Sequence, residues 1–413
     1  MNESASVPPH RTPGKPEISE SFTASFGSDP SALWSAPGRV NLIGEHVDYN
    51  GGPVMPFAIQ HRCYVAAAAN DDGVIRLRSK QFPTEAVSVA LADLATGAAH
   101  SHTREVQAQR FAGWASYVLG VIWALEQVGV HVPPVDVLVD GHVPVGAGLS
   151  SSAALECAAV GAFCDIAGVD IDGPQRATIA QRAENDFVGV PCGLMDQMAS
   201  TCARADHALL FDTYDQRIEQ IPLAASATGY EFLVVDTGAA HGLVDGEYAN
   251  RRAACEEAAR TLRVKLLREV ADRGPDESAA LVAGIADATL RRRARHVVSE
   301  ILRVSTAAEA LKAADWPRLG ALMTASHNSL RDDFEVSSPQ LDTAVEALLS
   351  SGALGARLTG AGFGGSVVAL IETSRLETAV SAVKTSFAAA GFKAPTASLA
   401  VASQGARREP PAR

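Results

Sequence analysis

A chain of 413 residues is long for a single hydrophobic core and predicts two lobes. Its composition, 47% hydrophobic and 20% charged, is that of an ordinary globular protein, and its net charge of −12 argues against nucleic acid as a partner. The six cysteines form no CxxC pair or zinc spacing, and no stretch approaches the ~20 apolar residues that span a bilayer. We therefore expect a cytoplasmic protein with reduced thiols and no membrane partner.

Between a Ser/Pro-rich leader and a similar tail, both expected to be loose, strand and helix patterns alternate. The N-terminal half predicts strands at 62–70, 73–82 and 135–139, and helices at 114–129, from about 150, and at 175–189. The C-terminal half predicts strands at 207–212 and 230–238, then mostly helix up to a glycine-rich stretch at 358. The boundary between lobes is expected just beyond residue 200. The basic cluster 291–295 is interpreted as a solvated helix face rather than a binding patch.

The strongest local signal is PVGAGLSSSAALECA, residues 144–158. A strand ends, glycines permit close approach of the backbone, three serines follow, and a helix begins. This arrangement directs unpaired N–H groups and the positive helix end at one point, which favours an anion. The stretch lacks the lysine of a GxxxxGK[ST] loop, so neutralisation must come from backbone dipoles and a cation. A serine N-cap on a tightly packed helix is the alternative.

Two acids twelve positions apart, Glu184 and Asp196, flank a bend that contains Gly, Pro and Cys. A helix-turn-helix arrangement could bring both carboxylates to one cleft. Glu184, expected on a helix, is the better candidate metal ligand, because a divalent ion normally needs at least one carboxylate. Asp196 follows a turn, where a carboxylate can face a substrate hydroxyl. Taken alone, each acid is more often a cap or a surface charge.

A third stretch, LTGAGFGGSVVALI at 358–371, places four glycines before an apolar strand. A dinucleotide fingerprint must follow a strand and open a helix, so that interpretation is rejected. A loop that lies against phosphates or substrate and a simple bulged turn both stay open.

The segment GRVNLIGEHVDYNGGPVMP, residues 38–56, holds more hydrogen-bonding groups than packing requires. It resembles the galactokinase signature nearly letter for letter. The three other stretches resemble, in order and separation, the galactose, homoserine, mevalonate and phosphomevalonate (GHMP) kinase superfamily. The resemblance runs from about Leu33 to Val401.

The resemblance implies an α+β fold of two lobes with the active site in the cleft between them. The N-terminal lobe would be a mixed sheet with helices, and the C-terminal lobe ferredoxin-like α/β. The implied segments are a flexible leader 1–20, an N-terminal lobe 21–203, a C-terminal lobe 204–401 with the glycine-rich loop 358–366, and a flexible tail 402–413.

The implied reaction is ATP-dependent, Mg²⁺-assisted phosphorylation of the anomeric hydroxyl of α-D-galactose. The positions that match the family's sugar contacts are Glu45, His46, Val47, Asp48, Gly193 and Tyr248. The positions that match its nucleotide contacts are Ser79, Gly146, Ala147, Gly148, Leu149, Ser150, Ser151 and Ser152. A pocket built for given hydroxyls can reject a wrong sugar by ~10⁴-fold or more.

Four residues are assigned to catalysis and metal binding by the same resemblance. Asp196 would accept or orient the proton of the 1-hydroxyl, and Arg39 would keep it ionised and stabilise charge on the transferring group. Ser152 and Glu184 would hold Mg²⁺. Alternatives are a related kinase for N-acetylgalactosamine or L-arabinose, and a non-catalytic galactose and ATP sensor. The Ser152–Ala153 pair, which some sensors lack, favours an active enzyme. A monomer is expected.

Overall fold

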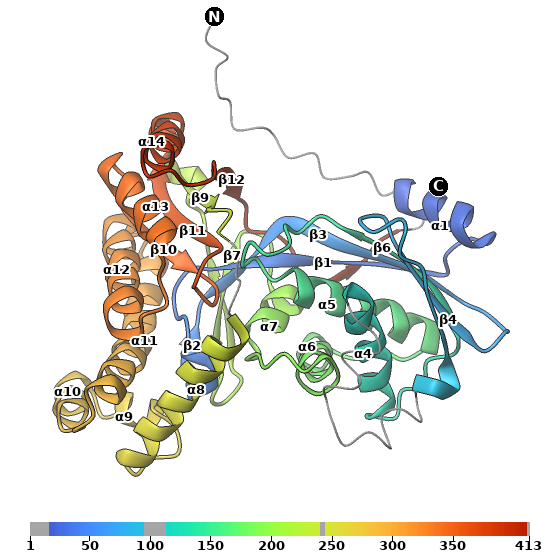
Figure 1. Cartoon of the computed structure of the whole chain (residues 1–413), viewed down its shortest axis with the longest axis horizontal. Coiled ribbons are helices and arrows are strands. Elements are labelled where there is room, and N and C mark those ends of the chain that lie inside the picture. Colours follow the sequence, from blue (N-terminus) through green and yellow to red (C-terminus); the bar gives the residue numbers. More distant parts are fainter. Residues whose placement is uncertain (1–15, 95–112, 240–243, 411–413) are drawn as a thin grey trace, which may run out of the picture.

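The computed structural model describes residues 16–94, 113–239 and 244–410, which form two sheet-and-helix parts and a small third sheet (Figure 1). The N-terminal part holds a six-stranded sheet in the order β13-β1-β3-β6-β4-β5. Its strands are β1 (Ala32–Asn41), β3 (Pro56–Ala69), β4 (Val74–Ser79), β5 (Val87–Ala90), β6 (Val135–Gly141) and β13 (Arg407–Arg408). Only β4 and β6 pair in parallel, so the expected mixed sheet is confirmed.

Strand β1 is buried along its whole length because helices cover both faces of the sheet. Alternate side chains of a strand point to opposite faces. Leu33 accordingly packs with Phe22 of α1 (Pro16–Phe26), and Trp34 packs on the opposite face with α5 (Ser151–Ala167). At Gly161 of α5, a Cβ atom would lie 2.3 Å from the Trp34 ring, so the glycine permits α5 to lie close against the sheet.

The remaining helices of the N-terminal part lie on the same side of the sheet as α5 (Figure 1). They are α4 (Trp114–Glu126), α6 (Gly173–Arg182) and α7 (Met195–Cys202), with the π-helical turn η2 (Ala183–Val188) between α6 and α7. The predicted helix at 175–189 therefore begins two residues earlier, where the Asp172 side chain accepts from the Gln175 N–H. Its last turn is π-helical, and Glu184 lies in that turn.

A three-stranded antiparallel sheet joins the two parts. Its order is β2-β7-β8, with β2 (Pro53–Val54), β7 (His207–Asp212) and β8 (Ile218–Pro222). Because β2 lies within the signature segment 38–56, pairing with β7 fixes the C-terminal end of that segment.

The C-terminal part is a four-stranded antiparallel sheet, β10-β11-β9-β12, packed against helices, as expected (Figure 1). Its strands are β9 (Tyr230–Asp236), β10 (Gly355–Thr359), β11 (Ser366–Glu372) and β12 (Thr396–Ala400). Its helices are α8 (Val244–Thr261), α9 (Arg268–Ala271), α10 (Pro275–Ala283), α11 (Ala288–Lys312), α12 (Trp316–Ser329), α13 (Pro339–Ser350) and α14 (Leu376–Ala389), with a π-helical turn η4 (Leu330–Phe334). Short 3₁₀ turns lie at Asp48–Asn50, Ser226–Thr228 and Thr373–Arg375.

The basic cluster 291–295 lies on α11, and its arginines have partners within the protein. Arg292 and Arg293 both form ion pairs with Glu335, and Arg293 is only 4% exposed. The predicted position of this cluster on a helix is confirmed. The face is held against the segment after η4, however, rather than freely solvated.

Two predicted loose segments are partly ordered. Residues 402–410 return to the N-terminal sheet: β13 pairs with β1, Ser403 N donates to the Ala58 carbonyl at 2.8 Å, and Glu409 N donates to the Leu33 carbonyl at 2.8 Å. The predicted flexible tail is therefore wrong for these residues, because backbone pairing holds a segment that has no apolar pattern. Helix α1 likewise begins at Pro16, inside the predicted leader. Residues 1–15 and 411–413 lie outside the described residues.

Candidate active site

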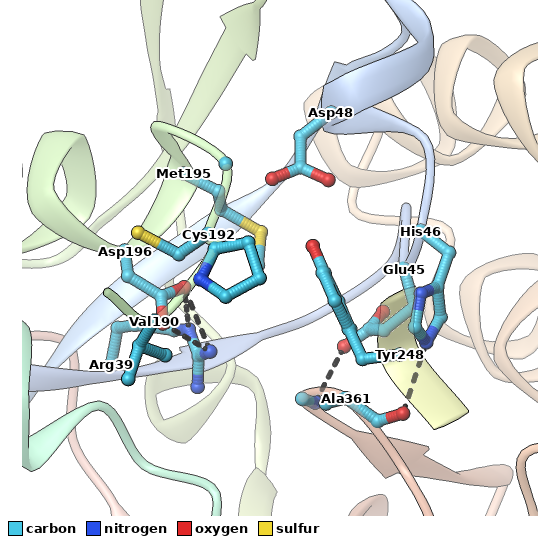
Figure 2. Close-up of a pocket in the computed structure, with 13 residues that line it drawn as sticks. Arg39, Glu45, His46, Asp48, Val190, Cys192, Met195, Asp196, Tyr248 and Ala361 are labelled. Atoms are coloured by element: carbon cyan, nitrogen blue, oxygen red, sulfur yellow. Dashed lines mark hydrogen bonds and ion pairs between the residues drawn. The ribbon is translucent and has the colours of Figure 1, made fainter. Parts of the chain in front are cut away.

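The signature segment 38–56, the bend at 190–196 and the glycine-rich loop after β10 meet at one cavity of about 180 Å³ between the two parts (Figure 2). Its lining includes seven of the eight residues predicted for sugar binding and catalysis. These are Arg39, Glu45, His46, Asp48, Gly193, Asp196 and Tyr248. The end of β1, the signature loop 42–48, the bend before α7, helix α8 and the loop after β10 each contribute part of the wall.

Arg39 and Asp196 form a bidentate ion pair on this wall (Figure 2). Nε donates to Oδ1 and Nη2 donates to Oδ2, both at 2.8 Å. The remaining guanidinium nitrogen, Nη1, donates to the Gly148 carbonyl at 2.6 Å. The Ser150 hydroxyl also donates to Asp196. A bidentate pair with a third anchor fixes the orientation of the carboxylate, so Asp196 is tied directly to the glycine–serine loop.

The glycine–serine loop 146–152 leads into the first turn of α5. Gly146 and Gly148 have φ of 75° and 71°, and Ser150, the N-cap, has φ of 61°. Because the Ser150 side chain is on Asp196, it does not cap the helix. The first N–H groups of a helix have no partner within it and carry its positive dipole end. This loop is therefore built to receive an anion.

The loop after β10 braces the glycine–serine loop. The Ser366 hydroxyl donates to the Ala147 carbonyl at 2.7 Å. A Cβ at Gly360 would lie 3.0 Å from the Gly148 carbonyl oxygen, and Gly360 has φ of 87°. A glycine at this position permits the close approach. Gly360 and Ala361 also line the cavity, so the third stretch lies at the candidate site. Its contact with phosphates or substrate stays a prediction.

Asp48 and Gly193 lie in direct contact on the cavity wall. A Cβ at Gly193 would lie 1.6 Å from Asp48 Oδ2 and 2.5 Å from Cγ, so this position admits only glycine while Asp48 keeps its place. Burial, reinforced by the nearby charge of Asp196, raises the pKa of Asp48 to about 6. Hydroxyl groups of a bound ligand are suitable partners for such a partly buried carboxylate.

His46 forms the aromatic side of the cavity with Tyr248, and its ring also packs against Tyr49. Its Nε2 lies 3.0 Å from the Ala361 carbonyl and its Nδ1 lies 3.0 Å from the Tyr49 hydroxyl. Burial lowers the pKa of His46 to about 3, so the ring is neutral. The carbonyl can only accept, which assigns the proton to Nε2 and makes Nδ1 the acceptor from Tyr49. The His46 and Tyr248 rings lie 5.6 Å apart.

Ser152, Glu184 and Gln197 lie together beside the loop. Glu184 Oε2 accepts from Gln197 Nε2 at 2.7 Å, and the Ser152 hydroxyl hydrogen-bonds the same carboxylate. Glu184 is 6% exposed, and burial raises its pKa to about 7. Glu156, fully buried nearby, has its pKa raised by burial and by the charge of Glu184. A buried acid pair of this kind is a favourable place for a cation.

This donor set fits a hard cation that keeps other ligands. The hydroxyl of Ser152 and the carboxylate of Glu184 are oxygen donors of the kind that Mg²⁺ prefers, and Mg²⁺ commonly takes its remaining ligands from phosphate and water. Across the described ranges 16–94, 113–239 and 244–410, no group of three or more His, Cys, Asp or Glu side chains is arranged to hold a metal ion.

The other predicted positions differ in how they reach the site. The Val47 side chain is buried in the hydrophobic core of the C-terminal part and does not line the cavity. The side chain of Val47 therefore does not make the predicted sugar contact from the cavity wall. Leu149 is also buried. Ser79 lies at the end of β4, paired with Val139 of the strand that leads to the loop, and its predicted place near the nucleotide stays a prediction.

Sequence reasoning missed several residues at or behind the cavity wall. Those on the wall are Val190, Pro191, Cys192, Met195, Gly360 and Ala361. The sequence does contain a signal near most of these residues: the bend rich in Gly, Pro and Cys at 189–193, and the run of glycines at 360–365. Gln197, which holds Glu184, directly follows Asp196, and a fully buried arginine, Arg357, lies behind Glu45.

Within the described part of the chain, no helix combines the length and apolar character needed to traverse a bilayer.

Three family models match the chain, and they cover the regions that build the site. They are the galactokinase galactose-binding signature (residues 20–69), the GHMP kinase N-terminal domain (116–204) and the GHMP kinase C-terminal domain (307–389). The first contains the loop 42–48 and the second contains the glycine–serine loop, Glu184 and Asp196.

Similar proteins extend over almost the whole chain. A galactokinase from Streptomyces coelicolor is 46% identical over 95% of this chain and 97% of its own length. A galactokinase from Mycobacterium tuberculosis is 41% identical over 90% and 98%.

Solved structures agree in fold. The Lactococcus lactis galactokinase complexed with galactose superposes with a TM-score of 0.84 at 30% identity, over 95% of this chain and 99% of that one. The Methanococcus jannaschii mevalonate kinase superposes with a TM-score of 0.63 at 17% identity, over 92% of this chain and 98% of that one. This is a likeness of fold alone.

Proposed function

The chain belongs to the galactokinase family of GHMP kinases, and from that premise we propose which of its residues carry out the reaction. The reaction is ATP-dependent phosphorylation of the anomeric hydroxyl of α-D-galactose, which gives α-D-galactose 1-phosphate and ADP. The observation that carries the assignment of roles is the Arg39–Asp196 pair, which lies on the cavity wall and is bonded to Gly148 and Ser150 of the glycine–serine loop.

Galactose occupies the cavity of Figure 2 in this proposal. Asp48 and Glu45 accept hydrogen bonds from sugar hydroxyls, and His46 and Tyr248 complete the wall. Glu45 and His46 are fixed before the sugar arrives, because Glu45 accepts a hydrogen bond from Gly360 N and His46 donates one to the Ala361 carbonyl. Preorganised polar groups discriminate between hydroxyl arrangements, since a wrong sugar leaves them unpaired in a buried place.

Asp196 orients the anomeric hydroxyl and takes its proton as the oxygen attacks the γ-phosphorus. Arg39 holds the carboxylate by two parallel hydrogen bonds, which leaves it one rotational position. Transfer of a phosphoryl group depends mainly on positioning and on stabilising charge. Arg39 contributes both, since its guanidinium lies between the acid and the loop that receives the phosphates.

The glycine–serine loop binds the phosphates of ATP through the backbone N–H groups of the first turn of α5. Ser152 and Glu184 would hold Mg²⁺, which supplies positive charge to the phosphate oxygens when bound. Gln197 holds the Glu184 carboxylate in place for that role. We also expect a cytoplasmic location and a monomer.

The test of these roles is Asp196→Asn, which keeps the shape of the side chain but cannot accept a proton. We expect turnover to fall about 10²–10⁴-fold, the usual range for a general base, with galactose binding still measurable by calorimetry. Asp212→Asn is a matched control, because Asp212 pairs with Arg268 at 3.0 Å, is similarly half-buried and does not line the cavity. Near-normal turnover of Asp196→Asn would remove Asp196 from the mechanism.

Sugar range is tested by an ADP-release assay with Mg·ATP across galactose, glucose, N-acetylgalactosamine and L-arabinose. We expect galactose to give the highest kcat/KM. A higher value with N-acetylgalactosamine or arabinose would favour the related kinases. Binding of galactose and ATP without ADP release would indicate a sensor.

A further inference from the structure

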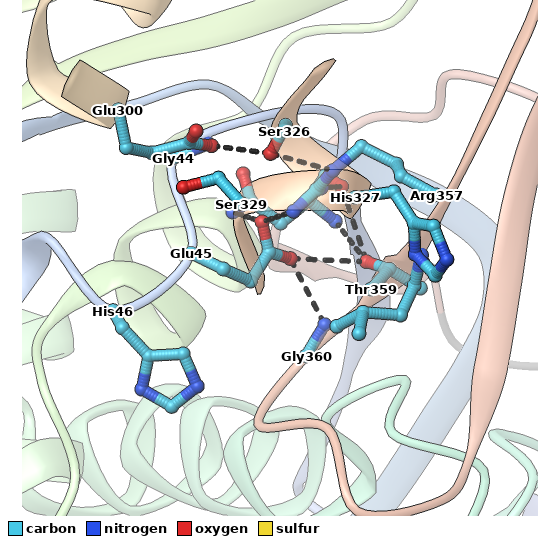
Figure 3. A network of polar contacts seen from close by, with 12 residues as sticks. Gly44, Glu45, His46, Glu300, Ser326, His327, Ser329, Arg357, Thr359 and Gly360 are labelled. Atoms are coloured by element: carbon cyan, nitrogen blue, oxygen red, sulfur yellow. Dashed lines mark hydrogen bonds and ion pairs between the residues drawn. The ribbon is translucent and has the colours of Figure 1, made fainter. Parts of the chain in front are cut away.

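Arg357 is the largest side chain in the structure that is completely buried (0% exposed). It lies on β10, behind the cavity wall and not on it. Its nitrogens have three separate acceptors: Nη1 donates to the Asn41 carbonyl at 3.0 Å, Nε to the Ser326 hydroxyl at 3.2 Å, and Nη2 to the Glu45 carboxylate (Figure 3). A buried arginine without a partner would be strongly destabilising, so these contacts hold it in one orientation.

Glu45 connects Arg357 to the cavity. It is 1% exposed and lines the cavity. Oε2 accepts from Arg357 and from Asn41 Nδ2 at 2.8 Å, and Oε1 accepts from Gly360 N at 2.9 Å. The carboxylate is therefore held from one side by the end of β1 and from the other by β10 and its loop. Among these donors only Arg357 is charged, so it supplies the counter-charge that a buried carboxylate requires.

A second buried acid extends the same network to the helices. Glu300 of α11 accepts from the Gly44 N–H at 3.0 Å and from the Ser326 hydroxyl at 2.6 Å, and pairs with Arg303. Ser326 is thus bonded to both Glu300 and Arg357. The signature loop is held at two successive residues by groups from the C-terminal part.

We infer that Arg357 is a positioning residue for sugar binding: it fixes the Glu45 carboxylate at the cavity wall and so sets the affinity for galactose. The inference rests on the proposed sugar contact of Glu45. Arg357 itself touches no substrate. The C-terminal part thereby determines the geometry of a pocket whose sequence signature lies wholly in the N-terminal part.

The competing explanation is that Arg357 only stabilises the fold. Arg62 supplies a matched control because it is also buried (3% exposed). It donates to the Ser35 hydroxyl and carbonyl and to the Gln404 and Gly405 carbonyls, and it does not line the cavity. Replacing Arg62 therefore removes a buried arginine with a comparable set of acceptors, but not one that holds Glu45.

The experiment compares Arg357→Lys, Arg357→Met and Arg62→Met in steady-state kinetics and thermal unfolding. A lysine keeps the charge but cannot reach three divergent acceptors at once. We expect both Arg357 variants to raise the galactose KM at least about tenfold, with Met worse than Lys, and to leave the ATP KM within about twofold. Arg62→Met should lower the melting temperature and change neither KM. Unchanged galactose KM in folded Arg357→Met, or an equal rise in Arg62→Met, would overturn the inference.

Glu45→Gln separates this inference from the proposed role of Glu45. If Glu45→Gln leaves the galactose KM unchanged, the sugar contact of Glu45 is wrong and the inference fails with it. If Glu45→Gln raises KM but Arg357→Lys does not, only the inference fails. The double variant should be no worse than the more severe single variant, because both changes act on one interaction.

Ser326→Ala provides a milder test if the Arg357 variants do not fold. It removes only the acceptor of Nε and the hydroxyl that bridges to Glu300. We expect a rise of about threefold in the galactose KM with no change in the ATP KM, since Arg357 loses one of its three acceptors and keeps its bonds to Asn41 and Glu45. No rise in folded Ser326→Ala would overturn the inference.

Discussion

Gly193→Ala is predicted to damage galactose binding through Asp48. A Cβ at this position would lie 1.6 Å from Asp48 Oδ2, whereas real Cβ atoms essentially never come closer than 3.0 Å to another heavy atom. The carboxylate must therefore move by about 1.4 Å. Rotation of the carboxylate alone does not relieve the clash, because Cγ also lies 2.5 Å away. The whole carboxyl group must turn about the Cα–Cβ bond and leave its place on the wall.

The size of the effect follows from that displacement. A shift of ~1 Å in a positioning group can reduce rates by ~10²-fold, and hydrogen bonds extend over only a few tenths of an ångström around their optimum. We expect kcat/KM for galactose to fall about 100-fold, which corresponds to about 2.7 kcal/mol, with the ATP KM within a factor of about two. The assay is coupled ADP release, first at varied galactose concentration with saturating ATP, and then at varied ATP concentration with saturating galactose.

Two variants control for other causes. Gly246→Ala adds a Cβ to exposed Gly246 of α8, where nothing lies within 4 Å, and should leave kinetics unchanged. Asp48→Ala combined with Gly193→Ala should match Asp48→Ala alone, because the added methyl group then has no carboxylate to displace. A folded Gly193→Ala with galactose kcat/KM within about threefold of wild type would refute the argument.

Three further predictions concern other parts of the molecule. His46→Gln should flatten the pH dependence of the free energy of unfolding. Burial holds the pKa of His46 near 3 in the folded protein, against 6.5 in the unfolded chain, so between these pH values only the unfolded chain binds this proton. The free energy of unfolding of the wild type therefore falls as the pH falls below 6.5, by at most about 1.4 kcal/mol per pH unit. Urea denaturation at pH 5 and 6.5 measures the change in the free energy of unfolding between these pH values. The same change in wild type and His46→Gln would contradict a neutral His46 ring in the folded protein. Glu184→Gln should raise the Mg²⁺ concentration needed for half-maximal activity at least about tenfold. The galactose dissociation constant, measured by calorimetry, should not change. An unaltered Mg²⁺ requirement would exclude Glu184 as a metal ligand. Gly161→Ala should lower the free energy of unfolding, measured by urea denaturation, by about 1–3 kcal/mol, because its Cβ would lie 2.3 Å from the Trp34 ring. The galactose KM should not change. A variant as stable as the wild type would show that the Trp34 ring can move aside.

Much of the site could be predicted from sequence because its parts are local motifs. The loop at 146–152, the signature at 38–56 and the acids Glu184 and Asp196 are each recognisable in a short window. In the family fold the signature and Asp196 line one cavity, and the loop and Glu184 lie beside it. The strands and helices between them were also predictable, since their apolar periodicity is strong.

The parts that could not be predicted depend on contacts between distant residues. Arg357 in a strand suggests an exposed side chain, and only its pairing with Glu45, 312 positions away, makes it a core residue. The strand at Arg407–Arg408 has no apolar pattern, and its place is set by pairing with β1. Val47 was assigned to the sugar by the resemblance, but its side chain packs in the hydrophobic core of the C-terminal part.

The most direct test of the central claim is a crystal structure with galactose, Mg²⁺ and a non-hydrolysable ATP analogue bound together. The proposed mechanism predicts the anomeric oxygen of galactose within about 2.5–3.2 Å of an Asp196 carboxylate oxygen. It also predicts the terminal phosphate against the first turn of α5, with Arg39 still paired to Asp196. A sugar whose anomeric hydroxyl points away from Asp196, or a nucleotide bound elsewhere than at residues 146–152, would contradict it.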